Sequence, residues 1–324
     1  MCGVGPARTI AGALAGAMWN KGVAPTLRHG RRRAGNEPHG QPWAGIGGPA
    51  VSRLFVFGLG YAARAIVAAS GWPALGTTRD GRDGTIRFDD ADAVRAGLAA
   101  ATHVLSSVPP DGADDPVLVR YRPLLGGHML AYLSSTGVYG DAGGAWVDEQ
   151  APVGGGRRPA RVMADAAWLA LGARVFRLPG IYGPGRSPLD RVAAGLAHRV
   201  DVAGQVFSRV HVADLARGVV AGFAGPAGAY NLADDLPTAQ NDVVAYAAAM
   251  LGLPPPPFVA LAALSPAARG FYAENRRVAN GRAKRVLGWT PLYPDYRAGL
   301  RAVSAMTSPT PASAAPAAAS GDQR

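Results

Sequence analysis

The stretch LFVFGLGYAARAIVAASG, residues 54–71, decides the fold prediction for this chain. Four apolar residues run into a glycine turn, and the chain leaves that turn as an alanine-rich segment. A buried strand that enters a helix through a tight glycine turn is typical of the first unit of an α/β fold. The small residues Gly58, Gly60 and Ala63 therefore raise the question of what the turn holds.

Working outward from this unit, residues 51–304 alternate between expected strands and helices. We expect strands at 53–58, 73–78, 85–88, 103–107, 129–134 and 173–178. We expect helices at 61–70, 90–100, 115–125, 159–171, 187–198, 214–223, 239–251, 280–287 and 294–304. Alternation with short connections favours an α/β fold with a doubly wound parallel sheet, and nearly all-apolar strands such as MLAYLSS fit burial on both faces.

The two ends of the chain lack this periodicity. Residues 1–50 are rich in Gly, Pro and Arg and include the run RHGRRR at 28–33, so we interpret them as a disordered basic leader or a misassigned start. Residues 305–324 are an Ala/Pro/Ser tail that we expect to be disordered. A net charge of +11 is compatible with binding to nucleic acid or to a membrane surface. The basic run has no interleaved aromatic residues that could stack on bases, and we expect neither partner.

Several other chemistries are excluded by residue type and spacing. The single cysteine, Cys2, cannot form an intrachain disulfide, and no apolar window reaches the length of a membrane span, so we expect a cytoplasmic protein. The six histidines show no metal-ligand spacing. The sequence also contains neither a G-x-S-x-G elbow nor a phosphate loop with G-K-[ST].

The glycine turn has the pattern of a dinucleotide-binding loop. Gly58, Gly60 and Ala63 form the pattern G-x-G-x-x-A between an expected strand and an expected helix, which is the context that this motif requires. Gly58 permits the tight turn, Gly60 lets the backbone approach a pyrophosphate, and Ala63 lets the helix pack closely on the sheet. The free N–H groups at the helix start favour an anion.

The end of the second expected strand indicates the cofactor. An NAD-binding protein usually offers a carboxylate about 20 residues after the turn. Here the sequence reads LGTTRDG at 75–81, with Thr78 and Arg79 in that place and Asp80 one step further. Hydroxyls and a guanidinium suit a 2′-phosphate, so NADP is preferred, while Asp80 keeps NAD open.

Several motifs in order resemble one known family. The chain resembles the extended, NAD-dependent epimerase/dehydratase-like branch of the short-chain dehydrogenase/reductase superfamily. The residues that carry the resemblance are FGLGYAA (57–63), YLSSTGVYGD (132–141), RLPGIYGPGR (177–186), RVHVADLARG (209–218), YNLADD (230–235) and RVANGRAKRVLGW (277–289). It implies a Rossmann domain with a smaller C-terminal substrate lobe, contributed mainly by residues 180–304, in a monomer or homodimer.

The resemblance also implies roles for single residues. Cofactor-binding candidates are Gly58, Gly60, Tyr61, Ala63, Thr78, Arg79, Asp89, Ser107, Pro109, Pro179 and Gly180. Substrate-binding candidates are Tyr139, Arg186, Arg209 and His211. Ser135 falls where the family places its substrate-orienting hydroxyl, with Thr136 beside it. Asp89 and Asp214 are also candidates for helix caps, and Arg209 and His211 for a solvated strand edge.

The catalytic pair departs from the family pattern. The family uses Tyr-x-x-x-Lys, and spacing places Arg157 at the tyrosine position and Arg161 at the lysine position, on the helix that contains RVMAD. Arg161 can supply the lysine charge. An arginine with a pKa above ~12 exchanges no proton near neutral pH, so Arg157 cannot replace the tyrosine.

Three interpretations of function stay open. The first is an oxidoreductase or epimerase that transfers hydride on a sugar-nucleotide or small hydroxy/carbonyl substrate, with a proton from water, Tyr139, Tyr182 or the substrate. In the second, Arg157 and Arg161 bind an anionic substrate in place of the lost pair. In the third, the protein is a non-catalytic NADP(H)-binding sensor or interaction module.

Overall fold

The computed structural model describes residues 52–307 of the 324-residue chain. The predictions for residues 1–50 and for most of the C-terminal tail fall outside this range. Helix α10, Tyr296–Thr307, includes the first three residues of the segment expected to be a tail.

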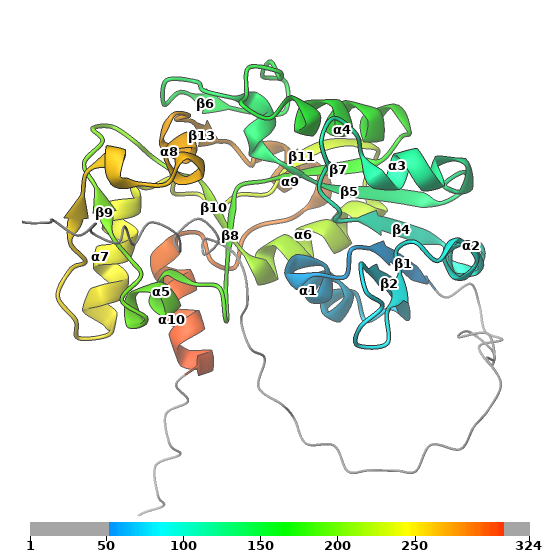
Figure 1. Cartoon of the computed structure of the whole chain (residues 1–324), viewed down its shortest axis with the longest axis horizontal. Coiled ribbons are helices and arrows are strands. Elements are labelled where there is room, and N and C mark those ends of the chain that lie inside the picture. The colour runs from blue at the N-terminus through cyan, green and yellow to red at the C-terminus, as the bar shows by residue number, and fades with distance from the viewer. Residues whose placement is uncertain (1–51, 308–324) are drawn as a thin grey trace, which may run out of the picture.

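Seven parallel strands form the central sheet (Figure 1). They are β1 Leu54–Phe57, β2 Ala74–Thr78, β3 Ile86–Arg87, β4 His103–Ser106, β5 Met129–Ser135, β7 Arg174–Leu178 and β11 Gly228–Asn231. Their order across the sheet is β11-β7-β5-β4-β1-β2-β3, and every neighbouring pair is parallel. This is the predicted doubly wound α/β sheet, with its change of winding direction between β1 and β4.

Alternate residues of β1 face opposite layers, because side chains in a strand have a period of two. Leu54 and Val56 pack with α1, Tyr61–Ser70, and α6, Val212–Ala224. Phe55 and Phe57 pack with α2, Ala91–Ala100, α3, Pro116–Tyr121, and α4, Pro159–Ala170. Figure 1 shows α1 and α6 on one side of the sheet and α3 and α4 on the other.

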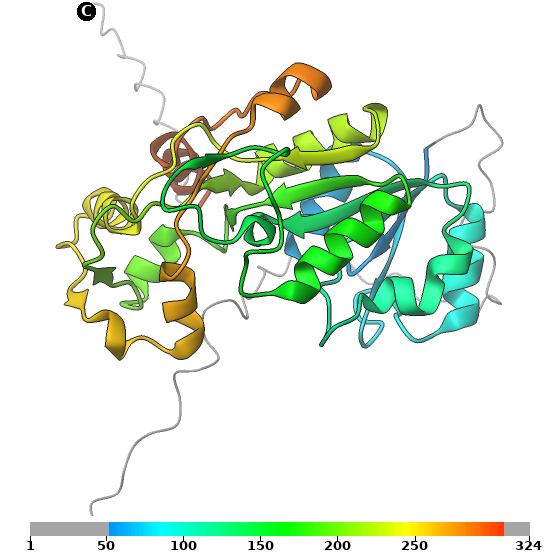
Figure 2. The same cartoon turned by 90° about the horizontal axis from the view of Figure 1, so that it is seen from above.

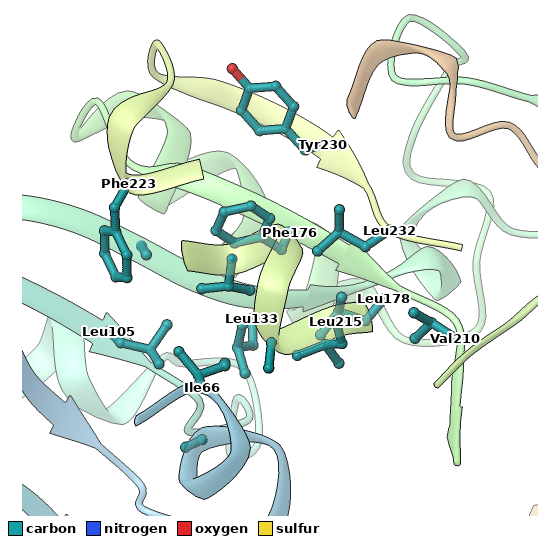
Figure 3. Packing of buried hydrophobic residues seen from close by; sticks show 14 of the residues in the cluster. Ile66, Leu105, Leu133, Phe176, Leu178, Val210, Leu215, Phe223, Tyr230 and Leu232 are labelled. Carbon is teal, nitrogen blue, oxygen red and sulfur yellow. The ribbon is translucent and has the colours of Figure 1, made fainter. Parts of the chain in front are cut away.

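The larger core cluster lies between the sheet and the α1–α6 pair. Ile66 of α1, Phe176 of β7 and Leu215 of α6 meet there in Figure 3, together with Tyr230 and Leu232 from β11 and just beyond it. Helix α9, Gly281–Leu287, packs on α6 and β11. Segments from late in the chain therefore complete the Rossmann layer itself.

A second, smaller core belongs to the lobe. It is built by α5, Pro188–Ala193, α7, Gln240–Met250, and α10, with Tyr182 and Tyr296 among its buried residues. Helix α8, Pro266–Tyr272, also lies on this side, and Figures 1 and 2 show these helices gathered at one end of the molecule. Within residues 52–307, no helix is long and apolar enough to cross a membrane.

The short strands outside the central sheet were not predicted. They pair as β6 Trp146–Val147 with β13 Arg277–Val278, β8 Gly180–Tyr182 with β10 Arg209–His211, and β9 Arg199–Val200 with β12 Phe258–Val259. Strand β11 and helix α8 were also missed, and α5 ends five residues before its predicted end at 198. These elements depend on distant partners rather than on local periodicity.

Gly222 provides a test of the packing between α6 and the sheet. A Cβ at Gly222 would collide with the Phe176 ring, whereas nothing lies within 4 Å of a Cβ at the exposed Gly126. We expect Gly222→Ala to lower the free energy of unfolding by about 1–2 kcal/mol, despite the better helix propensity of alanine. Gly126→Ala, the control, should change it by less than about 0.5 kcal/mol in denaturant titrations. Equal effects would contradict this packing.

Candidate functional site

The carboxyl ends of β1, β2, β4 and β5 meet at one edge of the sheet, next to the change of winding direction. Open parallel sheets bind ligands at this position. Gly58, directly after β1, has a φ of +81°, and a Cβ there would lie 3.0 Å from Ser107 Oγ. The Ser107 hydroxyl donates to the Gly58 carbonyl, so it fastens the loops after β1 and β4 to each other.

The start of α1 is open. Gly60 is the N-cap residue, no side chain caps the helix, and the first turn contains no acidic residue. The nearest protein atom to a Cβ at Gly60 would be the Gly58 carbonyl oxygen at 4.0 Å, so the backbone is accessible here. Ala63 is fully buried in the core, which brings α1 close to the sheet as the motif predicts.

Strand β2 supports the turn through a threonine. Thr77 Oγ1 accepts from the Gly58 N–H at 3.2 Å. At the strand end, Thr78 Oγ1 donates to Asp80 Oδ1 at 3.1 Å, and Arg82 lies 3.4 Å from the other Asp80 oxygen. Arg79 is exposed and makes no side-chain hydrogen bond to any residue in 52–307.

The cap interpretation of Asp89 is wrong. Asp90 is the N-cap of α2 and accepts from the Ala93 N–H at 3.0 Å. Both Asp89 oxygens accept from Arg87 at 3.0 Å, which holds the pKa of Asp89 below its ordinary range despite an opposing desolvation. The exposed Pro109 lies in the loop after β4. Whether Asp89 or Pro109 contacts a cofactor stays a prediction.

Ser135 lies at the carboxyl end of β5. It caps the short 3₁₀ helix η2, Thr136–Tyr139, by accepting from the Gly137 N–H at 3.1 Å. Its own hydroxyl proton stays available for another acceptor. Thr136 begins η2 and is buried. The strand thus places one half-buried hydroxyl, that of Ser135, at the carboxyl edge of the sheet.

Arg157 and Arg161 do not share one helix face. Helix α4 begins at Pro159, as predicted, so Arg157 precedes the helix and is not on it, contrary to its assignment to the tyrosine position of that helix. The Arg157 backbone N–H donates to Glu274 Oε1 at 3.0 Å, and its guanidinium lies over the Phe271 ring at 4.4 Å. Arg161 lies beside the Tyr132 hydroxyl, where burial raises the pKa of Tyr132 and the Arg161 charge partly offsets that effect.

A buried ion pair fixes α4 against β7. Arg177 donates to both oxygens of Asp165, at 2.8 and 3.1 Å, and Ser134 donates to Asp165 Oδ2 at 2.6 Å. Arg177 also donates to the Tyr139 hydroxyl at 3.1 Å, which in turn donates to Asn231 Oδ1 at 2.8 Å. The Tyr139 hydroxyl is therefore held inside the protein, and the structure does not support it as a substrate contact or proton donor.

The loop after β8 packs against the start of α1, next to the glycine turn. The Tyr61 hydroxyl donates to the Pro184 carbonyl at 3.2 Å, and the Arg186 guanidinium lies over the Tyr61 ring at 5.4 Å. Burial raises the pKa of Tyr61 to about 12. The half-buried Pro179 connects β7 to β8, and the exposed Gly180 is the first residue of β8. Arg186 thus lies next to the expected dinucleotide position.

Arg209 and His211 are buried, so neither the substrate role nor the solvated-edge interpretation holds. Arg209 donates to the carbonyls of Phe207 and Thr238 at 2.7 and 2.9 Å and to Gln240. His211 Nδ1 accepts from the Ala213 N–H and caps α6, and burial lowers the pKa of His211 to about 4. His211 is therefore neutral near pH 7.

Asp214 is not the cap of α6. Its carboxylate accepts from the backbone N–H groups of Leu292 and Tyr293 at 2.7 and 2.9 Å, and ties the segment before α10 to α6. Asp234 is also buried, close to Arg209 and Tyr182. Burial raises the pKa of Asp234 to about 8, although the Arg209 charge opposes the shift.

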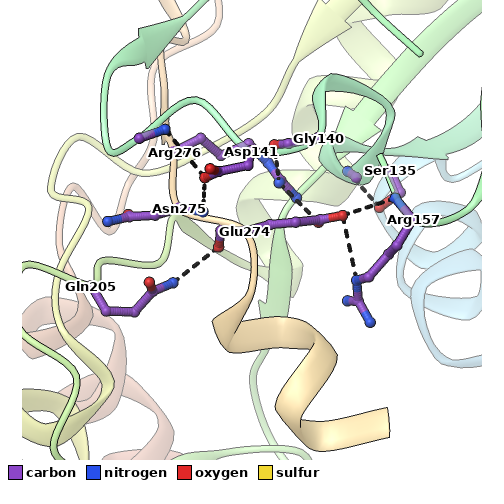
Figure 4. A network of polar contacts seen from close by, with 10 residues as sticks. Ser135, Gly140, Asp141, Arg157, Gln205, Glu274, Asn275 and Arg276 are labelled. Carbon is purple, nitrogen blue, oxygen red and sulfur yellow. Dashed lines mark hydrogen bonds and ion pairs between the residues drawn. The ribbon is translucent and has the colours of Figure 1, made fainter. Parts of the chain in front are cut away.

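Glu274 and Arg276 were not predicted from the sequence. These residues precede β13, and Arg276 donates to the Gly140 carbonyl and to Glu274 Oε2 at 3.0 Å. Both side chains are largely buried, next to Arg157 (Figure 4). No local motif marks them, because their partners lie more than a hundred residues earlier in the chain.

The chain is similar to one curated protein in sequence and to several solved proteins in structure. No protein-family model matches the chain. Over 142 residues it is 33% identical to a 3-diazoavenalumate denitrifying reductase from a Streptomyces species, a match that covers 40% of this chain and 46% of that protein. The match therefore spans less than half the length of this curated relative.

Solved structures match over most of the described range. A functionally unknown conserved protein from Silicibacter pomeroyi is 41% identical, with a TM-score of 0.73 and coverage of 79% of this chain and 99% of that one. MoeE5 in complex with UDP-glucose and NAD is 19% identical, with a TM-score of 0.63 and coverage of 79% and 98%. The human epimerase family protein SDR39U1 with NADPH is 16% identical, with a TM-score of 0.62 and coverage of 78% and 99%.

The parallel sheet, the glycine turn and the lobe define a Rossmann-type protein with the fold of NAD-dependent epimerases and dehydratases. Within that class, the chain belongs to the same family as the Silicibacter protein, and it shares its fold with epimerase-type proteins.

The buried carboxyl of Asp234 predicts a pH dependence of stability. A folded-state pKa raised from 3.8 to about 8 favours the protonated form, so its stabilising contribution is full below pH ~4 and is lost as the pH rises toward 8. Between about pH 7.5 and 8.5, His211 is almost entirely neutral in both the folded and the unfolded state, because its pKa is about 4 when folded and about 6.5 when unfolded, so it adds little opposing slope.

In that window we expect the free energy of unfolding to fall by at most about 1.4 kcal/mol per pH unit. Asp234→Asn should flatten this decline in denaturant titrations at several pH values. Asp92→Asn, at a carboxylate whose side chain is 95% exposed, is the charge-matched control and should keep the decline. A variant Asp234→Asn that keeps the wild-type slope would contradict the assignment.

Proposed function

We propose that this protein is an NAD(P)-dependent oxidoreductase of the extended short-chain type that works as a reductase on a small substrate. The observation that carries the proposal is the open turn at Gly58 and Gly60. This turn leads into the uncapped start of α1, at the change of winding direction of the sheet. The Ser135 hydroxyl lies on the same sheet edge.

The residues at this edge fit a dinucleotide. Gly60 leaves the backbone accessible, and the free N–H groups of the first turn of α1 suit a pyrophosphate. The Ser107–Gly58 bond gives the turn a fixed shape. MoeE5 and human SDR39U1, which share the fold, are described in complexes with NAD and NADPH, respectively. These features support a nicotinamide cofactor here.

The end of β2 favours NADP over NAD. The Asp80 carboxylate, which would bind a ribose 2′-hydroxyl, is bonded to Thr78 and paired with Arg82. The exposed Arg79 is available for a 2′-phosphate, which a guanidinium binds strongly.

The proton chemistry limits the substrate. When bound, a reduced nicotinamide supplies a hydride to the substrate. Ser135 can donate a hydrogen bond to that substrate, but the arginines at the positions of the missing pair exchange no proton near pH 7. The Tyr139 hydroxyl is bonded within the protein, and Tyr182 is buried in the lobe core. Any proton that the reaction needs therefore comes from water or from the substrate.

The Streptomyces relative supports this view. It is named as a denitrifying reductase that acts on 3-diazoavenalumate, a diazo compound named as an acid anion. Reduction of a group other than a carbonyl removes the need for a protein acid that protonates a carbonyl oxygen. A reductase of an acidic small molecule thus agrees with both the missing tyrosine and this resemblance.

Gly60→Ala separates cofactor binding from folding. The protein has room for a Cβ at this position, so we expect a stability loss of no more than about 1 kcal/mol for the poorer N-cap. The added methyl occupies the space that a pyrophosphate approaches, so the Kd for NADPH should rise at least about tenfold in tryptophan-quenching titrations. Gly126→Ala is the control. Unchanged binding in Gly60→Ala would mean that the turn is only structural.

Arg79→Ala tests the cofactor choice. Loss of a charge-assisted bond to the 2′-phosphate should weaken NADPH binding about tenfold or more, while NADH binding should change less than about twofold. Arg82→Ala, which removes a nearby arginine paired with Asp80, is the matched control. Equal loss for both nucleotides would contradict the role of Arg79.

Turnover decides between enzyme and sensor. The full chain with NADPH is assayed for NADPH oxidation against small carbonyl, unsaturated and diazo acids. Turnover that is lost in Gly60→Ala supports the reductase. NADPH binding without turnover on any of these acids would favour the non-catalytic alternative.

A further inference from the structure

A guanidinium outside every motif borders the same space as the Ser135 hydroxyl (Figure 4). A Cβ placed on Gly137 would lie 3.3 Å from Ser135 Oγ and 4.0 Å from Arg276 Nη2. Gly137 has no side chain, so this space stays open, although its backbone does not require glycine. Arg276 Nη2 makes no hydrogen bond to any residue in 52–307.

The other half of the Arg276 guanidinium is held firmly. Nη1 donates to the Gly140 carbonyl and to Glu274 Oε2, and the side chain is only 15% exposed. Burial opposes ionisation of Glu274, but the Arg157 N–H and the Arg276 guanidinium outweigh it and keep the pKa of Glu274 below its ordinary range. Arg276 is therefore preorganised, with one edge committed and the other edge turned toward Ser135.

The segment that carries Arg276 is anchored on both sides. The Asn275 N–H donates to Asp141 Oδ1 at 2.7 Å, and the Asn275 side chain donates to the Gly204 carbonyl at 2.9 Å. Gln205 donates to the Glu274 carbonyl at 3.0 Å. These bonds fix the lobe segment against the turn that follows β5, so Arg276 pays little ordering entropy when it binds a ligand.

We propose that Arg276 is a specificity-determining residue that binds a carboxylate group of the substrate together with Ser135; this inference rests on the proposed function. A guanidinium edge and a hydroxyl supply two donors, which match the two oxygens of a carboxylate. Arg157 and Arg276 share one carboxylate, that of Glu274, which leaves a net single positive charge at the site. One charge suits a carboxylate better than a phosphate dianion.

The test measures anion preference in the full chain saturated with NADP⁺. The probes are trans-cinnamate and its neutral isostere trans-cinnamamide, titrated by calorimetry. We expect cinnamate to bind at least about tenfold more tightly than the amide, and Arg276→Gln to abolish that preference. Arg276→Lys should restore part of it. Arg277→Gln is the matched control, because Arg277 bonds the Gly144 carbonyl instead.

Glu274→Gln gives a readout with the opposite sign. It keeps the size of the side chain and removes the negative charge beside Arg276, so cinnamate binding should become several-fold tighter. A purely structural role of the pair would weaken binding in both Glu274→Gln and Arg276→Gln, and that result would overturn the proposal. A cinnamate preference that survives in Arg276→Gln, or no cinnamate binding at all, would overturn it too.

The two proposals fail in different ways. A wild-type chain that binds no NADP⁺ contradicts the proposed function, and the cinnamate and cinnamamide titrations without NADP⁺ then decide the role of Arg276. Intact NADP⁺ binding in Arg276→Gln, within twofold of wild type, together with lost anion preference, supports both. Intact NADP⁺ binding without any anion preference in the wild type contradicts the role of Arg276 alone.

Discussion

The buried ion pair between Asp165 and Arg177 is the contact on which the rest of the site depends. It joins α4 to β7, and through Ser134, Tyr139 and Asn231 it also reaches β5, η2 and β11. A buried charge without its partner costs about 3–5 kcal/mol, so the pair strongly favours the observed register of α4 on β7, and its further hydrogen bonds attach the neighbouring elements to it. The ion pair holds α4 against the sheet. The position of this helix therefore does not depend on the tyrosine and lysine that Arg157 and Arg161 replace.

The sequence was most informative where local pattern and burial agree. The six strands predicted for residues 51–304 and the order of their helices follow from apolar runs, glycine turns and alanine-rich faces, and the structure confirms them. Strand β11 was missed because GAYN is short and half polar. Its strand geometry comes from pairing with β7, and Tyr230 is buried only in that context. The small paired strands are likewise products of long-range contact.

The site was harder to predict, because the role of a charge depends on what surrounds it. From the sequence, Arg209 was a candidate for substrate binding. In the structure its guanidinium donates to two backbone carbonyls and to Gln240. Asp89 and Asp90 are adjacent in sequence, and only geometry shows that Asp90 caps the helix. Arg276 lies about 140 residues after Ser135, and no spacing rule connects them. The glycine turn was predictable because its chemistry is local to six residues.

The strand order has a consequence for how the chain assembles. The sheet begins near its middle with β1 and grows outward, and β11 is the last strand to be added, on the outer side of β7. Until residues 228–231 emerge, β7 would be an edge strand with four buried residues and an unpaired row of backbone groups. Such edges attract other chains, so a nascent or truncated protein that stops before β11 would be prone to aggregate. The position of β11 thus leaves the edge of β7 unpaired until more than two thirds of the chain has been synthesised.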